Sequence, residues 1–196
     1  MNTKNKTLET LNKYIDFECN LTNCEPKDTT VMLRIQSFID YRNTRVKQKW
    51  YSEITHGKND RNIAIERNNL DRERRENHNK ALISLSSFND IFVNKFGLEP
   101  LYEGNLLTPE QIKAHAPECY DTRMEMTDFF LGFIKEITNY NTREIENPKV
   151  KDFYESLKDN VCDFERDFGV KENLEKDDGD IKLKDDNRNN YEDPII

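Results

Sequence analysis

Apolar residues recur at steps of three and four along most of the chain, which is the period of an amphipathic α-helix. A first helix is expected over about residues 3–18, on Leu8, Leu11 and Ile15. A turn over residues 20–27 precedes a second helix. That helix is capped by Asp28 or Thr29 and ends near Gly57, and its apolar stripe contains Val31, Ile35, Phe38, Arg42, Val46 and Trp50.

The third expected helix is the longest, over about residues 60–96, and Gly97 closes it. A loop over residues 98–105 follows. Thr108 and Gln111 then have the spacing of a capping box, with Pro109 at the first helical position of a short helix that ends near residue 115.

Two further helices complete the expected fold. One covers about residues 120–138, with an apolar face of Met126, Phe129, Phe130, Phe133, Ile134 and Ile137. The other has clear end signals, because Asn147 is a cap residue, Pro148 opens the helix and Gly169 closes it. Its stripe contains Val150, Phe153, Leu157, Val161, Phe164 and Phe168.

These patterns predict an all-α helical bundle of about five main helices, two of them long. Composition agrees, because the 196 residues include only six Gly and six Pro, few for a turn-rich β protein. Residues 1–170 are expected to form a single domain. Residues 171–196 lack apolar periodicity and carry 5 Lys/Arg against 9 Asp/Glu, so we expect a disordered acidic tail there.

No run of 18 apolar residues predicts a membrane span, and residues 1–11 are too polar for a secretory signal. The four cysteines are too sparse for a disulfide scaffold, so we expect a reduced, cytoplasmic protein. Two pairs of possible zinc ligands lie close in the sequence, Cys19 with Cys24 and His115 with Cys119. Neither pair has the short spacing of a zinc site, and no second pair repeats either spacing. The chain is therefore expected to hold no metal and no cofactor.

One stretch of the third helix breaks its apolar stripe. The positions that continue the stripe between Ile63 and Ala81 are largely polar, at steps of three and four, and include Arg67, Asp71, Arg74 and His78. Burying such groups without partners is costly, so they must be paired or line a wet cleft. We call these four residues the polar gap.

Three interpretations of the polar gap are open. The residues line a groove that binds an anion, a nucleotide or an acidic partner segment. Alternatively, the helix extends past the bundle and the stretch is solvated. In the third interpretation the stretch is an internally satisfied polar layer, in which Asp71 pairs locally with either Arg67 or Arg74, four and three residues away.

The stretch from Asp71 to Ile83 (DRERRENHNKALI), running on to residues 95–102 (KFGLEPLY), resembles an uncharacterised family of small helical proteins from Gram-positive bacteria and their phages. The resemblance covers about residues 60–105 and rests on an Arg-rich turn, a His-Asn pair and a Leu-Glu-Pro loop. It implies a helical fold and a bacterial or phage setting. No activity or catalytic role follows from it.

Two alternatives concern nucleic acids. Arg72 and His78, with five residues between them, satisfy the Arg-to-His count of all-α toxin-like ribonucleases, although six helical positions separate the side chains by about 120°. Residues 41–80 carry 11 Lys/Arg against 6 Asp/Glu, a balance that is typical either of a solvated helix, the preferred interpretation, or of nucleic-acid binding through segment 42–80. Within it, Trp50 and Tyr51 lie among basic residues that would suit nucleic acid, but we expect Trp50 in the core of the second helix because it falls on that apolar stripe.

The sequence itself does not determine a function. Because catalytic motifs are missing, the favoured hypothesis is a non-enzymatic interaction or regulatory protein. It would bind a protein partner or an anionic ligand at the polar gap. The oligomeric state cannot be predicted.

Overall fold

The computed structural model describes residues 6–162, and over that range it confirms the all-α prediction. This part contains six α-helices and no strand. The helices are α1 (Lys6–Thr22), α2 (Thr30–Ile54), α3 (Arg61–Asn89), α4 (Pro109–Ala114), α5 (Tyr120–Asn139) and α6 (Pro148–Asn160). The predicted acidic tail lies outside the described residues.

Short polar side chains begin the helices as the sequence predicts. Thr29 accepts a hydrogen bond from the Met32 amide at the start of α2, and Asn147 caps α6 in the same manner. Thr108 and Gln111 form the predicted capping box of α4. Each cap satisfies amides that would otherwise lack partners in the first helical turn.

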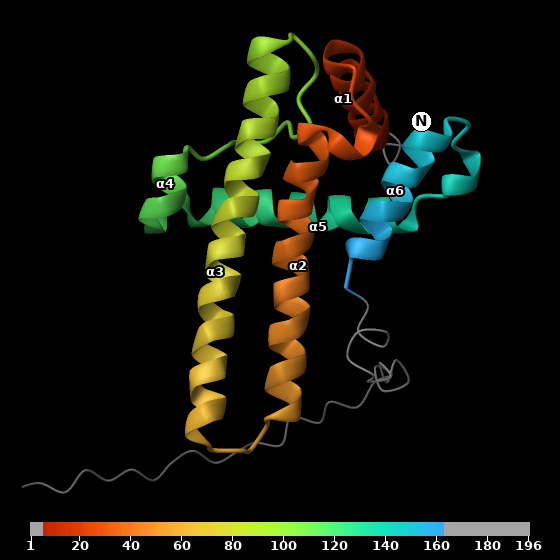
Figure 1. Ribbon diagram of the computed structural model, residues 1–196. Coiled ribbons are helices and arrows are strands. Elements are labelled where there is room, and N and C mark those ends of the chain that lie inside the picture. The colour runs from red at the N-terminus through yellow and green to blue at the C-terminus, as the bar shows by residue number, and fades with distance from the viewer. Residues whose placement is uncertain (1–5, 163–196) are drawn as a thin grey trace, which may run out of the picture.

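Two long antiparallel helices, α2 and α3, organise the fold (Figure 1). Helix α5 crosses both of them near the middle. Helices α1 and α6 pack against the half of the hairpin that contains the start of α2. The core between them is aromatic: the rings of Tyr14 and Phe92 stack at 4.0 Å, and those of Phe38 and Phe130 at 5.2 Å. Fully buried aromatic rings of this size contribute much of the apolar burial.

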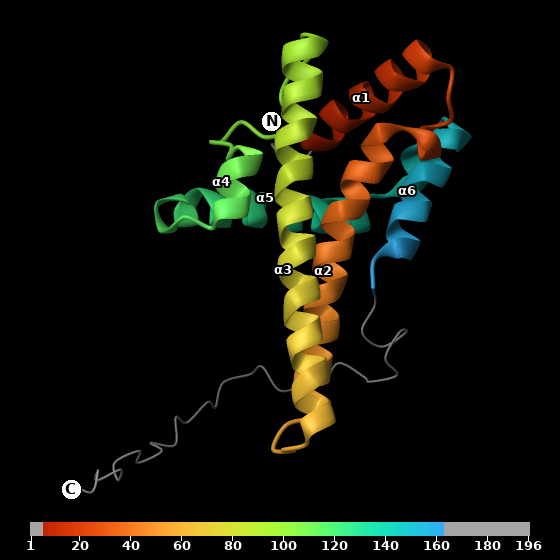
Figure 2. The same cartoon turned by 60° about the vertical axis from the view of Figure 1, so that its left-hand side comes forward.

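Beyond the crossing with α5, the hairpin of α2 and α3 continues as a two-helix projection, which both views show (Figure 2). We call residues 42–77 of this hairpin the arm. In the first twenty residues of α3, Leu70 is the one buried side chain. The arm is therefore held together mainly by polar contacts between its two helices.

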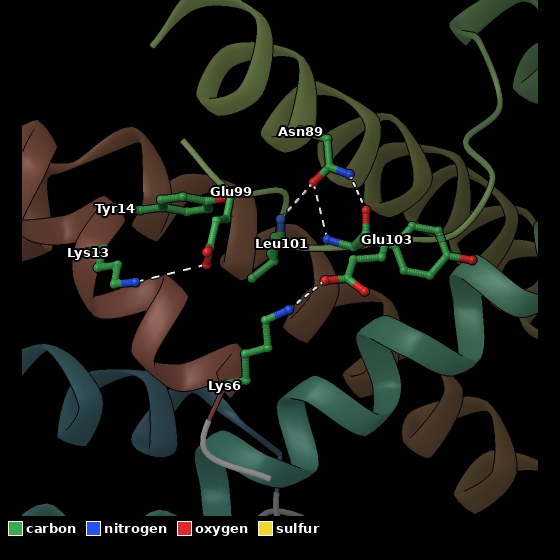
Figure 3. A network of polar contacts seen from close by, with 8 residues as sticks. Lys6, Lys13, Tyr14, Asn89, Glu99, Leu101 and Glu103 are labelled. Atoms are coloured by element: carbon green, nitrogen blue, oxygen red, sulfur yellow. Dashed lines mark hydrogen bonds and ion pairs between the residues drawn. The ribbon is translucent and has the colours of Figure 1, made fainter. Parts of the chain in front are cut away.

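The far end of α3 passes into a π-helical turn, Asp90–Lys95, and then into the loop over residues 98–105. Gly97 has a φ of +67°, the left-handed conformation expected of a residue that closes a helix. The side chain of buried Asn89 accepts hydrogen bonds from the Leu101 and Tyr102 amides at 3.0 and 3.2 Å and donates to the Tyr102 carbonyl (Figure 3). Asn89 thus holds the loop against the bundle.

Contacts with α1 secure the same loop from its other side (Figure 3). Lys6 forms an ion pair with Glu103 at 2.7 Å, and Tyr14 donates its hydroxyl to the carbonyl of Glu99. The loop therefore packs on α1 and α3, and it does not extend over the arm.

Two predictions about individual elements are wrong. The last helix was expected to reach Gly169, but α6 ends at Asn160, and Val161 has an extended backbone with ψ of 121°. The chain leaves the helix there because Val161 is buried and because the Cys162 amide donates to the Asn43 side chain on α2 at 2.8 Å. Trp50, expected in the core, is half-buried on the arm beside Tyr51 and outside the core cluster.

Candidate functional site on the arm

The polar gap lies where α3 packs against α2 along the arm and at its junction with α5. Leu70 is 2% exposed and is the apolar contact of this stretch. The four polar-gap residues follow one another along the same helix, and the structure gives each of them identifiable protein partners.

Arg67 lies nearest the arm tip and caps the end of α2. Its Nη2 donates to both the carbonyl oxygen and the hydroxyl of Thr55, each at 2.9 Å. A guanidinium at this position satisfies a terminal carbonyl and complements the negative end of the helix dipole. Arg67 remains exposed to solvent apart from this contact.

Asp71 is the acceptor at the centre of the polar gap. One carboxylate oxygen accepts from Arg74 Nη2 at 2.9 Å and from Gln48 of α2 at 3.4 Å, and the other accepts from Arg75. The hydrogen bond from Arg74, together with the charge of Arg75, holds the pKa of Asp71 below its usual value. The carboxylate is therefore ionised and its charge is balanced locally.

His78 lies at the junction of the arm with the bundle. Its Nε2 is 2.7 Å from the hydroxyl of Thr127 on α5, and its ring stacks on Tyr41 of α2 at 4.6 Å. Burial, then the nearby positive charge of Arg123, lowers the pKa of His78 from 6.5 to about 4. At neutral pH the ring is therefore uncharged.

Four side chains from different parts of the fold disfavour protonation of the His78 ring. Arg123 of α5, Arg74 of α3, His115 after α4 and Arg45 of α2 all disfavour its protonation. Arg123 is itself buried, and it donates to the side chain of Asn79 at 3.1 Å and to the carbonyl of Ile112. The uncharged His78 ring therefore lies among three arginines, of which Arg74 is paired with Asp71.

Sequence reasoning missed the contribution of α5 to this region. Arg123 and Thr127 precede Phe130 at steps of four and three, so they continue the apolar face of α5 into a polar stretch. That interruption repeats the signal that drew attention to α3. A comparison of the two interrupted stripes could have paired His78 with Thr127.

A groove of about 610 Å³ runs along one side of the arm between α2 and α3. Three cationic side chains line it, Arg45, Lys49 and Arg67. Two carboxylates also line the groove, Glu53 and Asp71. The Asp71 carboxylate is already bonded to Arg74 and Arg75. The remaining lining residues are Gln48, Tyr51, Ser52, Asn68 and Leu70.

Each of the three interpretations of the polar gap describes part of this arrangement. The hairpin does extend past the bundle, and Asp71 does pair with Arg74 inside a polar layer. Arg67 and Asp71 also face the groove, whereas Arg74 and His78 lie outside its lining.

Arg72 and His78, the pair considered for ribonuclease chemistry, lie in different environments. Arg72 is exposed, while His78 is half-buried with its Nε2 engaged by Thr127. Between residues 6 and 162, no three His, Cys, Asp or Glu side chains gather as metal ligands do. Of the helices in that range, none is long and apolar enough to cross a membrane.

Comparisons with known proteins do not assign the chain to a family. No family model, no curated protein and no solved structure matches the chain. The resemblance of residues 60–105 to a family of bacterial and phage proteins stays a prediction. The candidate site is therefore inferred from the contacts of its own residues.

Proposed function

We propose that the chain is a non-enzymatic binding protein that takes an acidic segment of a partner protein into the groove of the arm. The observation that carries the proposal is the groove itself, whose wall presents Arg45, Lys49 and Arg67. These cations belong to a segment with a local charge of +5, in a chain with a net charge of −8. Oppositely charged surfaces attract and orient partners of the complementary sign.

The charge balance inside the groove favours this ligand. Asp71 is neutralised by Arg74 and Arg75, and Glu53 forms an ion pair with Lys49 at 4.0 Å. The surplus is therefore positive but small. A carboxylate-bearing peptide needs a few cationic contacts and neighbouring hydrogen-bond groups, which Gln48, Ser52 and Asn68 supply.

Nucleic acid is the less favoured ligand. Proteins that bind it track the phosphate backbone with a continuous basic surface. On the arm, carboxylates are interspersed with the cations: Lys47 lies 3.8 Å from Glu73, and Asp71 sits between Arg74 and Gln48. This alternation interrupts the continuous basic track that a phosphate backbone requires.

The proposal is tested by measuring the affinity of a fluorescent oligoglutamate peptide for the full chain by anisotropy. Removing two groove charges with Arg45→Gln and Lys49→Gln should weaken binding by about three- to tenfold, since each exposed charge contributes roughly 0.2–1 kcal/mol. The matched control changes Arg143 and Lys113, which are exposed and outside the groove, to Gln. Equal affinities of the two double variants for the peptide would sink the proposal.

A labelled RNA strand of similar length serves as the second probe. Tighter binding of RNA than of the peptide, with a steep loss on adding salt, would favour nucleic-acid binding through segment 42–80. Cleavage of that strand, abolished by His78→Gln, would favour the ribonuclease hypothesis. The proposed function requires intact RNA and a preference for the peptide.

A further inference from the structure

The chain leaves the described part of the structure at the base of the arm. After α6 ends, the carbonyl of Asn160 accepts from Asn43 at 2.8 Å, and the carbonyl of Cys162 accepts from Arg42 at 2.7 Å. The Cys162 amide in turn donates to Asn43. Three hydrogen bonds therefore fix the start of the following segment to α2, within the first turn of the arm.

The segment that follows has the length and charge to reach the groove. Eight residues, 163–170, separate this anchor from the acidic residues 171–196. Eight extended residues span up to roughly 26–29 Å. Along α2, Lys49 lies seven residues beyond Arg42, a distance of about 10 Å along the helix axis.

We propose that the acidic segment 171–196 of the same chain occupies the groove of the arm and competes with the partner for it. This inference rests on the proposed function, because it assigns the same groove a regulator. The segment carries a net charge of −4, and its carboxylates gather at residues 177–180 (Asp-Asp-Gly-Asp) and 185–186 (Asp-Asp). It therefore has the chemistry that the groove selects.

Because the segment is attached to the base of the arm, a weak interaction with the groove is enough to keep it bound there. A tethered segment acts at an effective concentration of about millimolar for a short connection. A partner then binds the fraction of molecules whose groove is open, so its apparent affinity falls by that fraction. Partners with more carboxylates than the segment displace it from the groove. A partner therefore needs a minimum negative charge to bind.

The first test reads the contact without any added ligand. A zero-length carbodiimide reagent joins a carboxylate to a nearby lysine amine with loss of water, and mass spectrometry identifies the pairs in the full chain. We expect residues 171–196 to cross-link mainly to Lys49 in the groove, and this product to fade at high salt. Even cross-linking to Lys49, Lys95 and Lys113 would overturn the inference, because the latter two are exposed and outside the groove.

The second test reads competition with the oligoglutamate probe. The full chain with Asp177, Asp178, Asp180, Asp185 and Asp186 changed to Asn should bind the probe about three- to tenfold more tightly than the wild type. The matched control changes five exposed carboxylates elsewhere to amides, namely Glu9, Glu118, Glu125, Asp128 and Asp152. It lowers the net negative charge equally, so an equal gain in the control would show general electrostatics and overturn the inference.

The two tests separate the two proposals. Unchanged probe affinity in the Asn variant, with clear binding by the wild type, overturns the regulator and leaves the proposed function standing. A dominant cross-link to Lys49 with no probe binding by either protein supports the contact of segment 171–196 and removes the proposed partner. A dominant cross-link with a gain of affinity supports both.

Discussion

The burial of His78 predicts that acid destabilises the fold through this one side chain. The pKa of His78 is lowered to about 4 in the folded protein, against 6.5 ordinarily. The folded state therefore favours the neutral ring, and the stability it contributes is fully present above about pH 6.5. This stability is lost as pH falls toward 4, because the unfolded chain then binds a proton that the folded chain does not.

The two pKa values give the size of the effect. Between about pH 7 and 5 the linkage amounts to about 2 kcal/mol, and partial solvent access of the ring reduces it to about 1–2 kcal/mol. The charged groups around the ring are Arg123, Arg74, His115 and Arg45, and Asp71 bonds to Arg74 nearby. The three arginine charges stay constant over this range, and His115 is present in both the wild type and a His78 variant, so the difference between those two proteins isolates His78.

The assay is urea unfolding of the wild type and His78→Gln, followed by circular dichroism at several pH values. Glutamine keeps an amide that can bond to Thr127 but does not titrate. We expect the stability advantage of the wild type over the variant to shrink by about 1–2 kcal/mol between pH 7 and 5. Parallel losses of stability in the two proteins would contradict the expected role of His78, and His56→Gln, which removes an exposed histidine, provides the control.

Three further predictions follow from particular contacts. Leu70→Ala should cost about 2–3 kcal/mol, with the loss appearing as faster amide hydrogen exchange in the arm, and equal acceleration in α5 would contradict a local role. Asn89→Ala should lower the free energy of unfolding by about 2–4 kcal/mol in urea titrations, because it strips two amides and a carbonyl of the 98–105 loop of their partner; a loss under about 0.5 kcal/mol would show that water replaces the bonds. Gly97→Ala should cost about 1 kcal/mol through its positive φ alone, since a Cβ there meets nothing within 4 Å, and an unchanged urea midpoint would contradict this.

The helices could be predicted because their signals are local. Thr29, Thr108 and Asn147 begin helices through contacts within three residues, and apolar residues at helical spacing mark the buried faces. The end of α6 could not be predicted in the same manner. It depends on Asn43 and Arg42, which lie about 120 residues earlier in the chain.

The candidate site was predicted in part for a similar reason. Periodicity identified Arg67, Asp71, Arg74 and His78 as one face of a helix, but it could not say which part of the bundle that face meets. The arm emerges only when α5 crosses the hairpin, which leaves Trp50 outside the core and places Thr127 against His78. Arg45 and Lys49 became candidates because α2 and α3 together form the groove.

The affinity of the oligoglutamate peptide for the Arg45→Gln, Lys49→Gln double variant shows whether the groove of the arm binds an acidic protein segment. If it does, we expect a loss of about three- to tenfold relative to the wild type, with the Arg143→Gln, Lys113→Gln control unchanged. Equal binding by all three proteins would contradict it.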